Sequence, residues 1–341
     1  MTPAGMQFGL VIRGQAEPGE DITRRFEETL AMVRLADRLG YDSLTKTAHY
    51  SAHPFQMLQM VPMLARFAAE APRLRLNAGV VLLPLYSPLH IAEEFATLDV
   101  ICGGKVILGV GLGYRELEFR AFGTTQKDRV RRFEQNLVAI KRLWTEDTVT
   151  MRGGHFELDG ASCSPKPLQR PHPPIWVGAF ADRAIERAAR LGDCWYIGPS
   201  VSVATIDRQM ALYRRALDAA GKPFPAELPM RREVFVARTR DEAMRLCEPY
   251  LGAKYKAYHA WGQEIPPGDG GLDQDFASLV GDRFLIGSPS DVAVQILAIH
   301  RAMGVNHLVM STEWAGMPSS LAAETMEMIA AELIPAVRQG L

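Results

Sequence analysis

Short apolar runs alternate with helical patterns along almost the whole chain, and this alternation restricts the possible folds more than any other feature. Eight runs have the length and composition of strands: Met6–Ile12, Tyr41–Ala48, Leu74–Leu83, Lys105–Val110, Ile175–Gly178, Asp193–Ile197, Met230–Ala237 and His307–Ser311. Helical periodicity occupies the segments Asp21–Leu39, Pro54–Glu70, Pro88–Cys102, Arg129–Trp144, Asp182–Leu191, Thr205–Ala220, Asp241–Tyr255, Pro289–Met303 and Leu321–Val337. A strand that returns through a helix lies parallel to its predecessor. Eight such units predict an α/β fold, a closed (β/α)8 TIM barrel.

An open, doubly wound sheet is the alternative architecture, and it would normally carry a glycine-rich dinucleotide turn after the first strand. The sequence at that point, Ile12-Arg13-Gly14-Gln15, is no such turn. We therefore expect one barrel domain over residues 1–341.

Two insertions are expected within this domain. In residues 145–173, Gly153-Gly154 stands between two short strand-like runs and indicates a hairpin after the fourth helix. Residues 256–282 precede the last unit, and their Gly- and Pro-rich part, Gly262–Asp273, is typical of a mobile loop.

The charge balance argues against polyanionic partners. The chain has 38 Lys and Arg against 39 Asp and Glu, a net charge of -1, so neither nucleic acid nor an anionic membrane is an expected partner. The first residues lack the pattern of a secretory signal, and no uninterrupted apolar stretch approaches a membrane span, which predicts a cytoplasmic protein. The four cysteines show no CxxC spacing, so we expect reduced thiols and no metal site.

In a barrel, catalytic and binding residues lie at the carboxyl ends of the strands. Candidate residues follow the second strand, interrupt the third and follow the fourth. His49 follows the second strand, where an imidazole can transfer a proton or simply fix the loop. Gly79, followed by Val80, interrupts a branched apolar strand, which indicates a bulge, a packing contact or the close approach of another group. Tyr114 and Arg115 follow the fourth strand and offer an aromatic face and a fixed cation, unless Arg115 pairs with a neighbouring glutamate.

The fifth strand passes through Gly178, Ala179 and Ala181 directly into a helix that begins near Asp182. Free backbone N–H groups at a helix start form an anion site, which makes this the best phosphate candidate in the chain. The alternative is that the Asp182 side chain caps the helix and occupies those donors.

Nearly the whole chain resembles the bacterial-luciferase-like flavin monooxygenase family. The resemblance is strongest in three ordered blocks, which comprise Gly103–Gly111 with Glu118–Gly123, then Pro165–Gln169 with Pro174–Gly178 and Ala188–Asp193, and finally Ile286–Pro289 with Gly304–Leu308.

The resemblance implies a cofactor and roles for individual residues. Members bind reduced FMN or, in one branch, the deazaflavin coenzyme F-420 at the carboxyl ends of the strands. Gly79-Val80 corresponds to the bulge at the flavin ring, which in many members contains a non-proline cis peptide. Gly178 and Ala179, with the helix after them, correspond to the phosphate binders, and His49 corresponds to the active-site histidine. Tyr114, Arg115 and Ala181 are expected beside the cofactor.

Two residues depart from the family pattern. Many members have an acidic residue immediately before the histidine, whereas this chain has Ala48, and Lys46 is unexpected at the inner end of a strand. These departures leave the choice between FMN and F-420 open and raise the possibility of an unusual substrate or altered activity.

The resemblance predicts an oxidoreductase that uses reduced FMN and O2 to oxygenate a small organic substrate. A separate NAD(P)H:flavin reductase would supply the reduced flavin. The alternatives are F-420-dependent hydride transfer and a non-catalytic flavin-binding barrel. The resemblance also implies a homodimer, because members commonly pair through barrel helices. Apolar residues of the second and third helices extend beyond one core stripe, and the alternative is that they pack on the barrel; these residues are Met57, Met60, Met63, Leu64, Ile91, Phe95 and Leu98.

Overall fold

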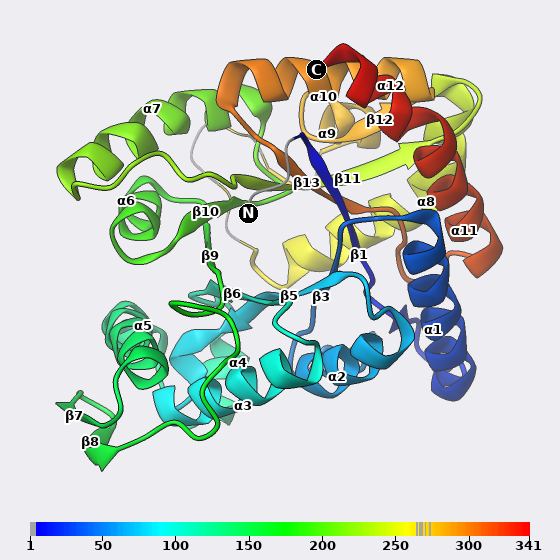
Figure 1. The fold of residues 1–341 in the computed structure, drawn as a ribbon. Helices are drawn as coiled ribbons and strands as arrows, with labels where there is room; N and C mark the ends of the chain where they lie inside the picture. The colour runs from blue at the N-terminus through cyan, green and yellow to red at the C-terminus, as the bar shows by residue number, and fades with distance from the viewer. Residues whose placement is uncertain (1–4, 264, 266–268, 270, 273) are drawn as a thin grey trace.

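Eight parallel strands close into a barrel at the centre of the structure, a computed structural model that describes residues 5–263, 265, 269, 271–272 and 274–341 (Figure 1). The strands are β1 Gln7–Val11, β3 Ser43–Lys46, β5 Arg75–Leu82, β6 Val106–Gly111, β9 Ile175–Ala179, β10 Cys194–Ile197, β11 Pro229–Val236 and β13 His307–Ser311. Their order around the ring is β1–β3–β5–β6–β9–β10–β11–β13, and β13 pairs again with β1. The predicted (β/α)8 TIM barrel is confirmed.

Helices surround the barrel (Figure 1). The main ones are α1 Ile22–Leu39, α2 Met60–Glu70, α3 Pro88–Ile101, α5 Arg129–Thr145, α6 Asp182–Leu191, α7 Val203–Ala219, α8 Arg240–Ala260, α10 Pro289–Met303, α11 Ser319–Met328 and α12 Ile334–Gly340. A π-helical turn, Ile329–Leu333, joins the last two. Helix α1 illustrates how capping residues determine where these helices begin and end. The Asp21 carboxylate accepts the N–H groups of Thr23 and Arg24, and Gly40 ends the helix with φ of 77°.

Alternation along the strands divides the core into two layers. Side chains on one face of the strands meet the helices, as Phe8 and Leu10 of β1 do. Side chains on the other face fill the barrel interior, where a smaller cluster comprises Val11, Ile107, Trp176, Cys194, Tyr196 and Val309, with Val80 packed against it. The interior is thus a packed core below the strand ends and not a pore, which leaves the carboxyl ends of the strands as the place for a site.

The hairpin insertion is confirmed, with β7 Val149–Arg152 paired antiparallel to β8 Glu157–Ala161 beside α5 (Figure 1). The second insertion begins later than the predicted residue 256, because α8 continues to Ala260. A short helix α9, Phe276–Val280, lies within it. Part of the predicted mobile loop, residues 264, 266–268, 270 and 273, lies outside the described residues.

The predicted helix Pro54–Glu70 was wrong at its start. Residues Gln56–Met57 form β4, which pairs antiparallel with β2, Gln15–Ala16, so the helix begins only at Met60. Two further elements were not predicted. A three-residue strand β12, Leu285–Gly287, pairs with the C-terminal half of β11. Helix α4, Glu116–Ala121, follows β6.

The apolar residues of α2 and α3 that suggested self-association are mostly buried within this chain. Met60, Met63, Leu64, Ile91, Phe95 and Leu98 all belong to the main core cluster. They pack between the two helices and the barrel, so they offer no exposed stripe to a second copy, and the homodimer stays a prediction without their support. Among the described residues, no helix combines the length and apolarity needed to span a lipid bilayer.

Candidate active site

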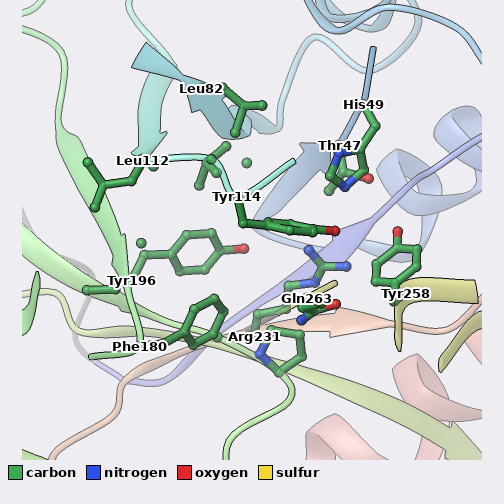
Figure 2. Close-up of a pocket in the computed structure, with 18 of the residues that line it drawn as sticks. Thr47, His49, Leu82, Leu112, Tyr114, Phe180, Tyr196, Arg231, Tyr258 and Gln263 are labelled. Atoms are coloured by element: carbon green, nitrogen blue, oxygen red, sulfur yellow. The ribbon is translucent and has the colours of Figure 1, made fainter. Parts of the chain in front are cut away.

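A cavity of about 270 Å³ opens at the carboxyl ends of the barrel strands (Figure 2). Seven of the eight residues predicted from the sequence line it, namely His49, Gly79, Val80, Tyr114, Gly178, Ala179 and Ala181. Figure 2 shows Phe180 and Tyr196 on one side of the cavity, and His49 and Tyr258 on the other. Residues far apart in sequence therefore meet in one site, of a size close to the lower end of typical small-molecule pockets, roughly 300–1,000 Å³.

The eighth predicted residue, Arg115, lies beside the cavity and not in its lining. Its guanidinium donates to the backbone oxygens of Tyr50 at 2.8 Å and Ser51 at 3.1 Å, and its Cζ lies 4.4 Å from the ring centroid of Trp261. It also lies 3.6 Å from Glu118, the neighbouring-glutamate pairing considered as its alternative. Arg115 therefore holds the loop that carries His49.

The imidazole of His49 is held in a defined orientation. Its Nδ1 lies 3.1 Å from Oε1 of Glu118, a fully buried carboxylate that also accepts the N–H of Tyr50 at 3.0 Å. The imidazole makes edge-to-face contacts with the rings of Tyr114, Tyr258 and Trp261. Because Nδ1 faces Glu118, Nε2 is the nitrogen left for a ligand. Sequence reasoning missed Glu118, which stands in the unpredicted helix α4, 69 residues further along the chain.

Strand β5 has the bulge that its glycine indicated. The register with β6 shifts between Ala78 and Val81, and the Gly79–Val80 peptide bond is cis. The bulge also explains a glycine in the neighbouring strand, because a Cβ at Gly109 would overlap the carbonyl oxygen of Ala78. Gly79 and Val80 thus present backbone and a short apolar side chain to the cavity, a surface against which a flat ring can lie.

The start of α6 faces the same cavity, and no side chain of the described residues caps it. Ala181 stands at the cap position, and the Asp182 carboxylate instead accepts the side-chain N–H of Gln209 at 3.1 Å and lies 3.3 Å from Arg208. The expected alternative, in which Asp182 occupies the free N–H groups, is therefore wrong. A Cβ at Gly178 would have its nearest neighbours at 3.5 Å, so the space above this residue belongs to the cavity. This arrangement fits a phosphate group.

Several residues of the cavity wall carry buried polar atoms that have no partner within the described part of the chain. They include Tyr114 Oη and Thr47 Oγ1, next to apolar side chains such as Leu82 and Leu112. Buried polar atoms normally have hydrogen-bond partners, so such groups in a cavity wall are suited to hydrogen-bond a ligand. The mixture of flat apolar walls and unsatisfied hydroxyls fits a planar heterocycle with polar edges.

A cationic wall, formed by Arg13, Arg231 and Lys254, is a further part of the site that sequence reasoning missed. All three side chains line the cavity, whereas no carboxylate of the described residues does. The buried carboxylate of Glu233 lies behind them, with Arg13 Nη2 at 3.5 Å and Lys254 Nζ in direct contact. Burial alone would raise the pKa of Glu233. The nearby cations, of which Lys254 has the largest effect, lower this pKa to about 2. No sequence motif links three residues from β11, α8 and the loop after β1.

Lys46, the unexpected residue at the end of β3, is fully buried and lies outside the cavity. Its Nζ donates to the backbone oxygens of Arg13 and Thr47. Burial lowers the pKa of Lys46 to about 7, an effect that Glu313 opposes and Arg13 reinforces. Lys46 thus braces the loop that carries Arg13.

Comparisons with known proteins agree with this geometry. A family model for the luciferase-like monooxygenases matches residues 6–307. The FMNH2-dependent dimethylsulfone monooxygenase of Pseudomonas putida is 30% identical over 301 residues, which are 82% of this chain and 81% of that enzyme. The F420-dependent glucose-6-phosphate dehydrogenase of Amycolatopsis mediterranei is 27% identical over 292 residues, 80% of this chain and 85% of that enzyme.

Among solved structures, the monooxygenase RslO1 of Streptomyces bottropensis superposes with a TM-score of 0.84 at 28% identity, and the match covers 97% of this chain and 99% of that one. Similarity of sequence and of fold thus extends over the barrel and the cavity together. The chain belongs to the luciferase-like monooxygenase family.

Proposed function

We propose that this chain is the oxygenase of a two-component system, which binds reduced FMN and uses O2 to oxygenate a small organic substrate. One observation carries the proposal. The bulged Gly79-Val80 segment, the uncapped start of α6 and the Glu118-held imidazole of His49 all face a single cavity.

The residues present fit the cofactor in three places. The free N–H groups at the start of α6 would hold the phosphate, with the space above Gly178 left open for it. The Gly79-Val80 surface and the ring of Tyr114 would bound the flat ring system. When bound, reduced FMN supplies the electrons with which one atom of O2 is transferred to the substrate while the other leaves as water.

His49 would move the proton at this site. Its Nδ1 is fixed by Glu118, so Nε2 is directed to the cavity as donor or acceptor, and the negative charge of Glu118 would stabilise the imidazolium after proton uptake. The surrounding aromatic rings and the side chains of Leu82 and Leu112 restrict the access of water to this point.

The reduced flavin would come from a separate NAD(P)H:flavin reductase. The name of the Pseudomonas putida relative describes an enzyme that depends on FMNH2, and family membership supports the same use here. The relative that depends on F420 supports a second candidate, hydride transfer with F-420 in the same cavity and without O2.

The test has a binding step and a turnover step. Under anaerobic conditions, the purified protein is titrated with reduced FMN and reduced F-420 at matched concentrations. It is then supplied with FMN, NADH, a flavin reductase and isotopically labelled O2, together with a panel of organic acids, sulfones and ketones. We expect tighter binding of reduced FMN and a product that has gained one labelled oxygen atom. Substrate oxidation that requires F-420 and consumes no O2 would contradict the proposal, and so would flavin binding without turnover of any panel member.

A further inference from the structure

We propose that the substrate carries an anionic group, a carboxylate or a sulfonate, which the cationic wall of Arg13, Arg231 and Lys254 binds, with Arg231 as the main contact. This inference deepens the proposed function, because it names the substrate class of the same cavity.

Arg231 is a cation with unused hydrogen-bonding capacity. Its Nε donates to Ser311 Oγ at 3.1 Å, and the Arg231 side chain makes no other hydrogen bond to the described residues. Within that part of the chain, the two terminal nitrogens of Arg231 have no hydrogen-bond acceptor, and no carboxylate lies within 4 Å to form an ion pair. Since a guanidinium presents its donors as a planar fork, these two nitrogens match the two oxygens of a carboxylate or sulfonate.

The charges around Arg231 are not balanced by the protein. Four cationic residues of the described chain line the cavity, Arg129 and the three of the cationic wall, while the acid behind that wall, Glu233, already accepts from Arg13, Lys254, Tyr255 and Trp314. A second buried acid, Glu313, is turned toward the backbone N–H groups of Arg13 and Gly14. Burial, and after it repulsion by Arg13, lowers the pKa of Arg231. An incoming anion would relieve this repulsion, which is the property of an anion site.

The topology separates the cationic wall from the residues proposed to hold the cofactor. In the ring of eight strands, β11 lies opposite β5, which carries Gly79-Val80, and β1, whose following loop carries Arg13, lies opposite β9, which carries Gly178. The cofactor residues on β5 and β9 and the cationic residues on β11 and after β1 therefore occupy two sides of the ring, and β10 alone separates the strand of the phosphate cradle from the strand of Arg231. His49 follows β3, between β1 and β5, so its imidazole lies between the two sides.

The unpaired state of Arg231 also has a cost in the free protein, which argues for a ligand. A partly buried cation without a counter-ion is unfavourable, and an apolar side chain at this position would avoid the penalty. Strand β11 nevertheless places Arg231 toward the cavity and near Tyr196; burial raises the pKa of Tyr196, and the charge of Arg231 opposes part of that increase.

The test compares charged and neutral probes of the same shape. Benzoate and benzenesulfonate, with benzamide and benzenesulfonamide as their neutral partners, are titrated by calorimetry into the full-length protein in the presence of FMN. The variants are Arg231→Gln, which removes the charge, and Arg231→Lys, which keeps it. Arg24→Gln, at a side chain that is 66% exposed on α1, is the matched control.

We expect the wild type and Arg24→Gln to prefer the anions over the neutral partners. Arg231→Gln should weaken anion binding by about 10–100-fold, the usual effect of losing a charge-assisted hydrogen-bonded contact, while Arg231→Lys retains part of the preference. Thermal unfolding of each variant shows whether the protein is folded. FMN affinity, measured in parallel, should change by less than about threefold in Arg231→Gln.

Two results would overturn the inference. One is a wild type that binds neither anion more tightly than its neutral partner. The other is an Arg231→Gln variant that loses FMN and anion binding by the same factor, because the cationic wall would then serve the cofactor. A wild type that binds the anions but no flavin would leave this inference standing and contradict the proposed function instead, so the two failures are distinguishable.

Discussion

Replacement of His49 by alanine should reduce turnover far more than it affects cofactor binding or stability. The imidazole lines the cavity with Nδ1 fixed by Glu118, so its loss removes the proposed proton carrier. General acid–base groups contribute typically about 10²–10⁴-fold, and oxygenation by His49→Ala should fall by a factor in that range. The affinity for reduced FMN should stay within about threefold, because the phosphate cradle after β9 lies away from the loop after β3.

The structural cost of the same change is small and can be bounded. His49→Ala loses one hydrogen bond to a carboxylate, while Glu118 keeps the N–H of Tyr50 and the nearby Arg115. Such a bond contributes roughly 1–3 kcal/mol. With an unfolding entropy of about 2.1 cal/mol/K per residue over 341 residues, this corresponds to a decrease of about 1–4 °C in the thermal midpoint.

The assay follows incorporation of labelled oxygen into whichever panel member the wild type converts, with flavin affinity and thermal midpoint measured on the same preparations. His53→Ala is the matched control, because His53 is an exposed histidine in the same loop. An unchanged rate with a lowered midpoint would refute the catalytic role of His49. A parallel loss of rate and of FMN affinity would instead make His49 part of the cofactor site.

Three further predictions concern the cofactor site and the buried lysine. Calorimetry should show tighter binding of reduced FMN than of flavin adenine dinucleotide or NADH, since we propose a single phosphate site at α6 and the sequence after the first strand has no dinucleotide turn; equal binding would remove the case for the α6 site. Gly178→Val should weaken FMN binding by at least about tenfold, whereas Gly178→Ala, whose Cβ has 3.5 Å of space, should keep it within about threefold with an unchanged thermal midpoint; equal affinities would exclude the cradle. The folded pKa of Lys46, about 7, is below its unfolded value, so the penalty for burying its charge is complete below pH 7 and disappears as the pH rises toward 10.5. The free energy of unfolding of Lys46→Met minus that of the wild type should therefore be more positive at pH 6 than at pH 9 in denaturant unfolding, and a constant difference would show that Lys46 does not titrate in this range.

The boundaries that the sequence missed have a common physical reason. The predicted helix from Pro54 began too early because residues 56–57 pair with Gln15–Ala16, a contact between segments 40 residues apart. Strand β12 is only three residues long, and it forms because it can pair with the C-terminal half of β11. Local periodicity contains no information about such pairings, which form only when distant segments meet.

The candidate site divides in the same way. Local sequence determined the alternation of strands and helices, the bulge at Gly79 and the helix start after Ala181, because each depends on the properties of a few consecutive residues. By contrast, the pairing of His49 with Glu118, the turning of Arg115 away from the cavity and the convergence of Arg13, Arg231 and Lys254 were decided by tertiary structure. Closure of the barrel brings the ends of eight strands to one opening. Only there do positively charged side chains more than 200 residues apart in the sequence lie next to one another.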